Sequence, residues 1–139
     1  MVAVGGERRP AINAHAPSEI RFESVRLAPD ARLSFAVGIG DAKQGKGGDG
    51  VRFVVRVEDR SGAPVEVWSR RVGAEERGWI DAEVELEAFA GSRVNLILAT
   101  EELANARADF SAWGEPVLRS AGYRMDLRDF PILRKVNIR

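Results

Sequence analysis

Alternation of apolar and polar residues is the feature that most constrains how this chain can fold. From Ile80 to Leu86, apolar side chains alternate with acidic ones, and Val94 to Thr100 repeats the alternation after a turn at Gly91-Ser92. A period of two residues is typical of a strand with one buried and one solvated face. We therefore expect these two runs to be a pair of strands from one antiparallel sheet.

The same period predicts further strands along most of the chain. They are expected at Glu19 to Leu27, Ala31 to Ile39, Val51 to Glu58, Pro64 to Val72 and Asp109 to Leu118. The turn residues Arg60 to Ala63 predict a hairpin between the third and fourth of these. No run of eleven or more residues carries a 3.6-residue period. Short strands joined by Gly, Pro and Asp turns predict an all-β fold, an antiparallel β-sandwich.

The composition and the apolar-polar alternation divide the chain into three parts. Residues 1–18 are rich in Gly, Pro, Ala and charge and predict a loose arm with at most a short edge strand. Residues 19–118 carry the strand signals and predict the sandwich. Residues 119–139 alternate weakly around Pro131, so we expect a C-terminal strand or tail that docks on the sheet or begins a neighbouring domain.

Composition excludes several classes of function. The chain of 139 residues has 21 Lys+Arg and 21 Asp+Glu, so it lacks the basic excess of a duplex-binding protein, and no nucleic acid partner is expected. The count of zero cysteines excludes thiol catalysis and Cys-ligated metal sites, and leaves the compartment open. No apolar run approaches the roughly 18 residues that span a bilayer, so no membrane span is expected.

Catalytic motifs are also missing from the sequence. His15 is the single histidine and has no partner motif around it, so a Ser-His or Cys-His site is not predicted. Glu83 and Glu85 fall on the solvated face of one strand, whereas glycoside hydrolysis needs carboxylates that face each other across a cleft. Gly45-Lys46 is followed by Gly47, not by Ser or Thr, so the phosphate-loop pattern fails. We expect no enzyme activity from this chain alone.

The order of motifs resembles a known family. The segments that carry the resemblance are Leu33 to Ile39, Asp49 to Val55, Val67-Trp68, Trp79 to Leu86, Phe89 to Leu96, and Asp109 with Trp113-Gly114-Glu115-Pro116. Together they resemble the galactose-binding-like β-sandwich, in particular the carbohydrate-binding-module-like domains attached to bacterial glycosidases and sulfatases. The resemblance spans roughly Ile20 to Leu118. It implies a jelly-roll accessory domain without catalysis of its own.

The tail carries a second resemblance. Pro131 to Ile138 is similar to the opening of an alkaline-phosphatase-like sulfatase domain, which would place the nucleophile beyond Arg139. The resemblance implies that this chain is the N-terminal accessory module of a bacterial sulfatase-type enzyme, with the catalytic domain of the same chain as its partner.

Three residues are the candidates for ligand binding. Trp68 falls on the same strand face as Glu66 and Arg70, so it is the tryptophan expected to be exposed. An exposed ring could stack on a sugar. The alternative is that the ring packs within the protein. Arg52 and Arg56 share one strand face and could bind a carboxylate or sulfate. Their alternative is a solvated charge ladder with Glu58 and neighbouring glutamates.

A structural calcium ion is a further possibility. Asp41 and Asp49 flank a glycine-rich loop that offers hard oxygen ligands, and galactose-binding-like domains often hold a calcium. The alternative is ordinary Asp-Gly turn chemistry, and no cofactor is expected otherwise.

Two functions remain from the sequence. The first is a non-catalytic accessory module that binds carbohydrate, for which a concave surface bearing Trp68 would be favourable. The second is a structural or protein-interaction domain that docks on a partner domain, for which an exposed apolar patch would be favourable.

Overall fold

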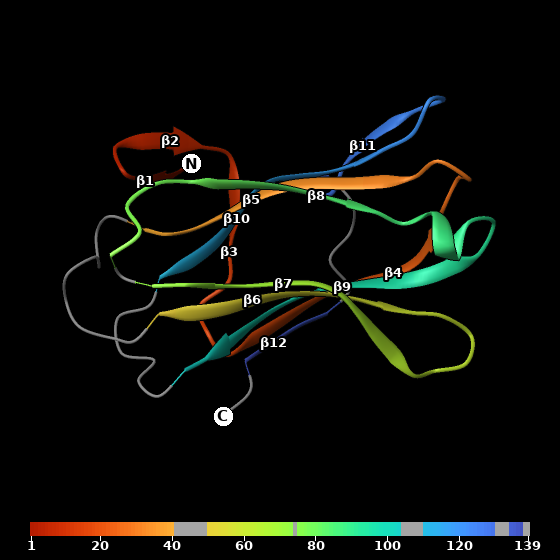
Figure 1. Cartoon of the computed structure of the whole chain (residues 1–139), viewed down its shortest axis with the longest axis horizontal. Helices are drawn as coiled ribbons and strands as arrows, with labels where there is room; N and C mark the ends of the chain where they lie inside the picture. The colour runs from red at the N-terminus through yellow and green to blue at the C-terminus, as the bar shows by residue number, and fades with distance from the viewer. Residues whose placement is uncertain (41–49, 74, 104–109, 130–133, 138–139) are drawn as a thin grey trace.

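A computed structural model describes residues 1–40, 50–73, 75–103, 110–129 and, as backbone, 134–137. Within these ranges the chain is an all-β antiparallel sandwich (Figure 1). Its strands are β1 (Val2–Val4), β2 (Glu7–Arg9), β3 (Ala11–Asn13), β4 (Ser18–Arg26), β5 (Arg32–Ile39), β6 (Val51–Glu58), β7 (Pro64–Val72), β8 (Ile80–Glu85), β9 (Arg93–Glu102), β10 (Ser111–Arg119), β11 (Arg124–Asp126) and β12 (Arg134–Asn137). A 3-10 turn covers Glu87–Phe89. No helix in these ranges is long and apolar enough to cross a membrane.

Two five-stranded sheets form the two layers of the sandwich (Figure 1). Sheet I has the order β11-β10-β5-β8, and β3 also pairs with β10. Sheet II has the order β12-β4-β9-β6-β7. The hairpin β1-β2 lies beside sheet I at one end of the molecule.

The period-two pattern places the core between the layers. Leu33, Phe35, Val37 and Ile39 of β5 are buried, as are the four alternate apolar residues of β6 that begin at Val51. Trp113 of β10 is fully buried, and its ring lies edge-on to Phe35 and Phe53 with centroids 5.3 Å from each. The expected strands of residues 19–118 and the hairpin β6-β7 are therefore confirmed.

The expected pairing of the two runs around Gly91 is wrong. β8 pairs with β5 in sheet I, whereas β9 lies between β4 and β6 in sheet II. The 3-10 turn carries the chain from one layer to the other. Alternation predicts which face of a strand is buried, but it does not predict the partner strand.

The first 18 residues are more ordered than a loose arm. β1 and β2 form an antiparallel hairpin, and β3 pairs with β10. Ala14 and Ala16 are fully buried, and the amide of Ala14 donates to the carbonyl oxygen of Ser111 at 2.9 Å. These strands have three residues each, too few for a period-two pattern to stand out.

The last described residues also pair with the sheets. β11 returns antiparallel to β10, and the backbone of β12 pairs with β4 at the edge of sheet II. The tail was expected either to dock on the sheet or to begin a neighbouring domain, and the pairing of β12 with β4 agrees with docking on the sheet.

Candidate functional site

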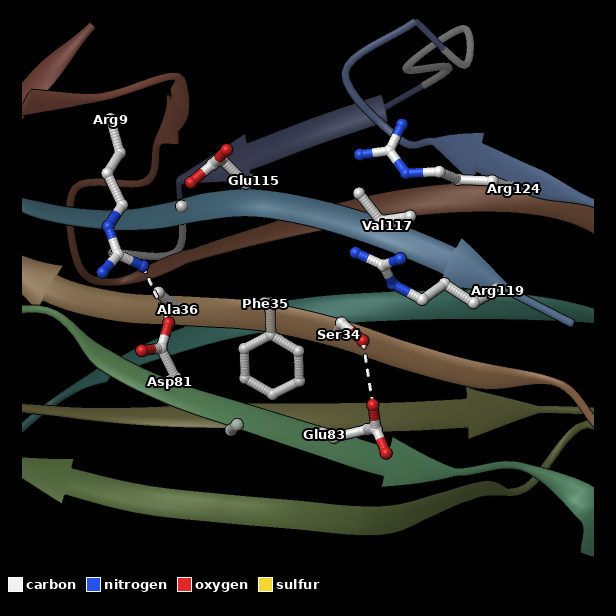
Figure 2. Close-up of a pocket in the computed structure, with 12 residues that line it drawn as sticks. Arg9, Ser34, Phe35, Ala36, Asp81, Glu83, Glu115, Val117, Arg119 and Arg124 are labelled. Atoms are coloured by element: carbon white, nitrogen blue, oxygen red, sulfur yellow. Dashed lines mark hydrogen bonds and ion pairs between the residues drawn. The ribbon is translucent and has the colours of Figure 1, made fainter.

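A groove of about 540 Å³ runs over the outer face of sheet I (Figure 2). Its centre is hollow because the outward positions of β5 and β10 there carry small side chains, namely Ser34, Ala36 and Gly114. Most of the other side chains that line the groove are charged: Arg9, Asp81, Glu83, Glu115, Arg119 and Arg124. The sandwich thus presents a polar hollow on one of its two outer faces.

The N-terminal hairpin closes one end of this groove. The indole of Trp79 covers the two glycines Gly38 and Gly114, where an added Cβ would lie 3.3 Å and 2.9 Å from the ring. The indole Nε1 donates to the carbonyl oxygen of Glu7 at 2.9 Å, which fastens β2 to the ring. Trp79 therefore packs on the outer face of sheet I.

Arg9 stabilises the same end of the groove through ion pairs. Its guanidinium is bound to Glu7 at 2.8 Å and to Asp81 at 2.7 Å, and it lies 5.7 Å from the Trp79 ring centroid. The hydrogen bonds to Glu7 and Asp81 raise the pKa of Arg9 above its usual value. With two carboxylates bound, the strongest donors of Arg9 are already used within the protein.

Arg119 and Arg124 occupy the opposite end of the groove. They lie directly opposite each other on β10 and β11, and both are exposed. Figure 2 shows their side chains on the groove face on either side of Val117. Neither arginine forms an ion pair with a residue in the described part of the chain. These two cations are therefore open to an external anion.

A β-bulge shapes the wall between the two ends. The register of β10 against β5 shifts between Gly114 and Val117, and Glu115 takes a positive φ of 43° there. The amide of Glu115 donates to the carbonyl oxygen of Pro10 at 2.9 Å, so the bulge is anchored to the N-terminal segment. Bulges of this kind redirect side chains, and here the Glu115 carboxylate is exposed beside the groove.

Trp68 does not take the face that its parity predicted. The register of β6 against β7 shifts between Val55 and Arg56, so Val67 is the extra residue of a bulge and Trp68 lies opposite the buried Val55. Its half-buried ring meets Phe35 edge-on with centroids 4.8 Å apart. A one-residue bulge exchanges the two faces of a strand, which strand parity alone cannot show.

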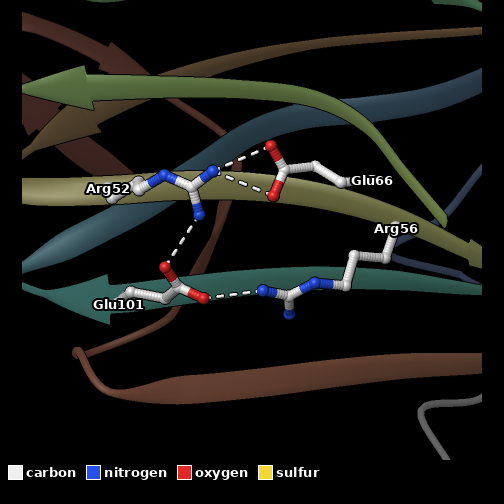
Figure 3. Close-up of polar contacts among 4 residues, drawn as sticks. All are labelled: Arg52, Arg56, Glu66 and Glu101. Carbon is white, nitrogen blue, oxygen red and sulfur yellow. Dashed lines mark hydrogen bonds and ion pairs between the residues drawn. The ribbon is translucent and has the colours of Figure 1, made fainter. Parts of the chain in front are cut away.

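Arg52 and Arg56 lie on the outer face of sheet II in a network of ion pairs (Figure 3). Arg52 donates to both oxygens of Glu66 at 2.8 Å and to Glu101 at 2.8 Å. Arg56 donates to the other oxygen of Glu101 at 2.6 Å. The charge ladder considered for these arginines is present, with Glu66 and Glu101 as the partners in place of Glu58.

This network covers a small apolar cluster. Val54, Ile97 and Ala99 are buried although they point away from the main core. Arg56 lies opposite Ile97, yet it reaches Glu101, so its side chain crosses the row formed by Val54 and Ala99. Long arginine stems commonly shield apolar surface in this way.

The same contacts change the acidity of the two glutamates. Hydrogen bonds from Arg52 lower the pKa of Glu66. Burial opposes ionisation of Glu101, but hydrogen bonds from Arg56 and Arg52 outweigh it and lower its pKa. Both groups are therefore ionised at neutral pH, and the four residues form a charge-balanced set.

Other hollows lie outside the groove on sheet I. One of about 660 Å³ is largely apolar and is lined by the N-terminal residues Met1 to Ala3, His15 and Phe110, whose ring meets His15 edge-on at 5.4 Å. Another of about 520 Å³ is lined by turn residues and by the exposed Arg26, Arg60 and Arg93. Neither contains Trp68, Arg52 or Arg56. A further hollow of about 460 Å³ on sheet II is lined by Arg56 together with Glu19 and Glu101.

The calcium expectation lies outside what the structure describes, because Asp41 and Asp49 are not among the described residues. Among those that are, no group of three or more His, Asp or Glu side chains is placed to hold a metal ion.

Sequence reasoning missed Arg119 and Arg124. A signal was present: Arg119-Ser120-Ala121-Gly122-Tyr123-Arg124 reads as a hairpin turn between two arginines, and the Ser120 amide donates to Tyr123 at 2.9 Å. A hairpin across that turn places the two arginines opposite each other.

Comparison with known proteins shows similarity to part of a longer protein. An uncharacterised protein of Archaeoglobus fulgidus is 35% identical over 106 residues, a match that covers 71% of this chain and 26% of the relative. The chain thus spans about a quarter of the length of that protein. No protein-family model matches the chain.

Proposed function

We propose that this chain is a non-catalytic accessory module of the galactose-binding-like type that binds carbohydrate in the groove on sheet I. The observation that carries the proposal is the groove itself. It combines a floor of small side chains with planar carboxylates and guanidinium groups along both walls. Such groups are suited to fixing sugar hydroxyls by hydrogen bonds.

Two of the acidic side chains of the groove are engaged in contacts within the protein, which supports a non-catalytic role. Asp81 is bound to Arg9 at 2.7 Å, and Glu83 accepts from the Ser34 hydroxyl at 3.2 Å. His15 lies outside the groove against Phe110. A role without catalysis is therefore the one that these contacts support.

The accessory role draws support from the relative. The matched part is a quarter of that protein, so a segment similar to this one occurs within a longer chain there. Attachment to a larger bacterial enzyme of the sulfatase type is part of the proposal. This part rests on the resemblance of the segment from Pro131 to Ile138 to the opening of a sulfatase domain. Within that segment, the backbone of β12 pairs with β4.

A glycan array of the folded chain tests the proposal. Ser34→Tyr places a large side chain on the groove floor and should abolish binding, because Ser34 faces outward at its centre. Ser69→Tyr adds the same group to an exposed position of β7 and is the matched control. Binding that survives Ser34→Tyr would remove the groove as the site.

Trp68→Ala belongs in the same experiment. Its ring packs on Phe35, so we expect this variant to be less stable but still to bind the array ligand when it is folded. Specific loss of binding in a folded Trp68→Ala variant would return the site to the position that the sequence suggested.

A second proposal is a structural domain that docks on a partner domain. The apolar hollow at the N-terminal end favours it, since Met1 and Phe110 are 71% and 42% exposed there. Exposed apolar patches commonly mark interaction sites. A blank glycan array from a folded chain would favour this second role over carbohydrate binding.

A further inference from the structure

We infer that Arg119 and Arg124 form a subsite for a single anionic substituent, a sulfate ester or a uronate carboxylate, at one end of a carbohydrate bound in the groove. The inference rests on the function proposed above and specifies the chemistry of its ligand.

The backbone forces the two arginines together. The β10-β11 register pairs Arg119 with Arg124, and the β10-β5 register pairs Arg119 with Arg32 on its other side. Three arginines therefore lie in one row across three strands, and on the fourth strand Glu85 lies opposite Arg32, so the unbalanced like-charge pair is Arg119 with Arg124. Like charges directly opposite each other destabilise an antiparallel pair, so this row has a cost that an anion would offset.

Another pair of facing arginines in the sandwich, Arg52 and Arg71, differs because the protein supplies carboxylates to Arg52. Arg52 lies opposite Arg71 on β7, but glutamates flank Arg52 on both sides at 2.8 Å. In the row on sheet I, Arg32 has Glu83 at 3.6 Å, whereas Arg119 and Arg124 have no ion-pair partner in the described ranges. Two guanidinium groups with unfilled donors match the planar oxygens of a sulfate or carboxylate.

Charge changes sign along the groove, and this limits the ligand further. Arg119 and Arg124 form a basic end, while the remainder is lined by Asp81, Glu83 and Glu115, of which Asp81 is paired with Arg9. A densely sulfated chain would meet those carboxylates with like charge. The preferred ligand is therefore an oligosaccharide with one anionic group at the arginine end and neutral sugars over Ser34 and Ala36.

The test compares matched oligosaccharides that are neutral, singly sulfated or singly carboxylated, and densely sulfated. The singly charged members should bind best. Arg119→Gln with Arg124→Gln should weaken their binding by about tenfold or more and leave a neutral counterpart unchanged, because charge-assisted hydrogen bonds are lost only with the charged ligand.

Arg26→Gln with Arg93→Gln is the matched control. Arg26 and Arg93 also lie opposite each other on adjacent strands and are exposed, but they line the hollow at the turns, away from sheet I's face. This double variant removes the same charge and should keep the binding of singly charged glycans. Equal loss in both double variants would overturn the inference in favour of general electrostatic attraction.

The remaining outcomes separate the inference from the proposed function. Neutral glycans that bind as well as charged ones, with loss on Ser34→Tyr, would retain the function and refute the anionic subsite. Binding of no glycan would refute both. A titration with sodium sulfate, followed by NMR of the arginine Nε–H groups, adds a last arm: a free anion that perturbs Arg119 and Arg124 without any glycan binding would also overturn the inference.

Discussion

Trp79 lies over Gly114 on the outer face of sheet I, and an added Cβ at Gly114 would stand 2.9 Å from the Cζ3 atom of the indole. Because the indole of Trp79 also donates a hydrogen bond to the carbonyl oxygen of Glu7 in β2, the ring positions the N-terminal hairpin beside the groove. The absence of a side chain at Gly114 is what allows the ring to lie so close.

Gly114→Ala should therefore destabilise the protein. The new methyl group has to displace an indole held by Glu7 and by Arg9, and such overpacking costs about 1–3 kcal/mol. The expected result is a lower Tm in thermal unfolding and faster proteolysis near β1-β2. Gly122→Ala is the control, since nothing lies within 4 Å of its added Cβ, and an equal loss there would contradict the packing argument.

The ion-pair network on sheet II predicts a dependence of stability on pH. Glu66 and Glu101 have folded-state pKa values below the ordinary value of 4.5. Their contribution to stability is therefore complete above about pH 4.5 and is lost as the pH falls through the lower, folded-state values. Urea unfolding between pH 3 and pH 7 should show this decline in the free energy of unfolding. The decline should be smaller in 1 M salt, because salt screens the attraction between the arginines and the glutamates.

Glu101→Gln isolates one member of that network. The variant should lose at most about 1 kcal/mol at pH 7, because the carboxylate is partly exposed, and its stability should fall less steeply toward acid pH. Glu102→Gln changes the exposed neighbour on the same strand, which has no ion pair among the described residues, and serves as the control. An unchanged acid slope in Glu101→Gln would contradict the assignment.

The sequence predicted the strands well because each alternating run has a fully buried side. In β5 and β6 the alternate apolar residues that the period of two places on one face are all buried. What it could not predict were features that depend on contacts between distant strands. The crossing of the chain between β8 and β9 depends on which sheet buries each apolar face, and local alternation is the same for either partner.

The candidate site was predicted less well, and bulges are the reason. The bulge at Val67 turns Trp68 into the core, and the bulge at Glu115 shapes the groove wall. Arg119 and Arg124 come together through a short hairpin in a segment whose alternation is weak. Arg52 and Arg56 were placed on the correct strand face, but their bound partners Glu66 and Glu101 lie on two other strands.

Trp68→Ala should reduce stability as a core substitution does. The ring contacts Phe35 at 4.8 Å and lies 6.3 Å from the Trp113 centroid, so its removal leaves a cavity at the edge of the core. A half-buried position predicts a loss of about 2–4 kcal/mol, somewhat below that of a fully buried aromatic residue. Urea denaturation measures it, and Trp68→Phe should recover part of the loss. A Trp68→Ala variant as stable as wild type would show that the ring does not support the core.

A buried chain of hydroxyl groups links the two sheets and supports the last prediction. The Thr100 hydroxyl of β9 donates to the carbonyl oxygen of Ala14 at 3.0 Å, and the hydroxyl of Ser111 on β10 donates to the same oxygen. Because the Thr100 proton is used, Ser18 donates to Thr100 at 2.6 Å. All three side chains are buried.

Thr100→Val keeps the shape of the side chain but leaves the Ser18 hydroxyl buried without its acceptor, so it should cost about 1–3 kcal/mol. Ser18→Ala should cost less, because Thr100 retains Ala14 as its acceptor. The double variant Ser18→Ala/Thr100→Val should be more stable than the sum of the single changes implies, since no polar group of the pair is then left unsatisfied. Urea unfolding of the four proteins completes the double-mutant cycle, and strictly additive losses would mean that the two hydroxyl groups do not interact.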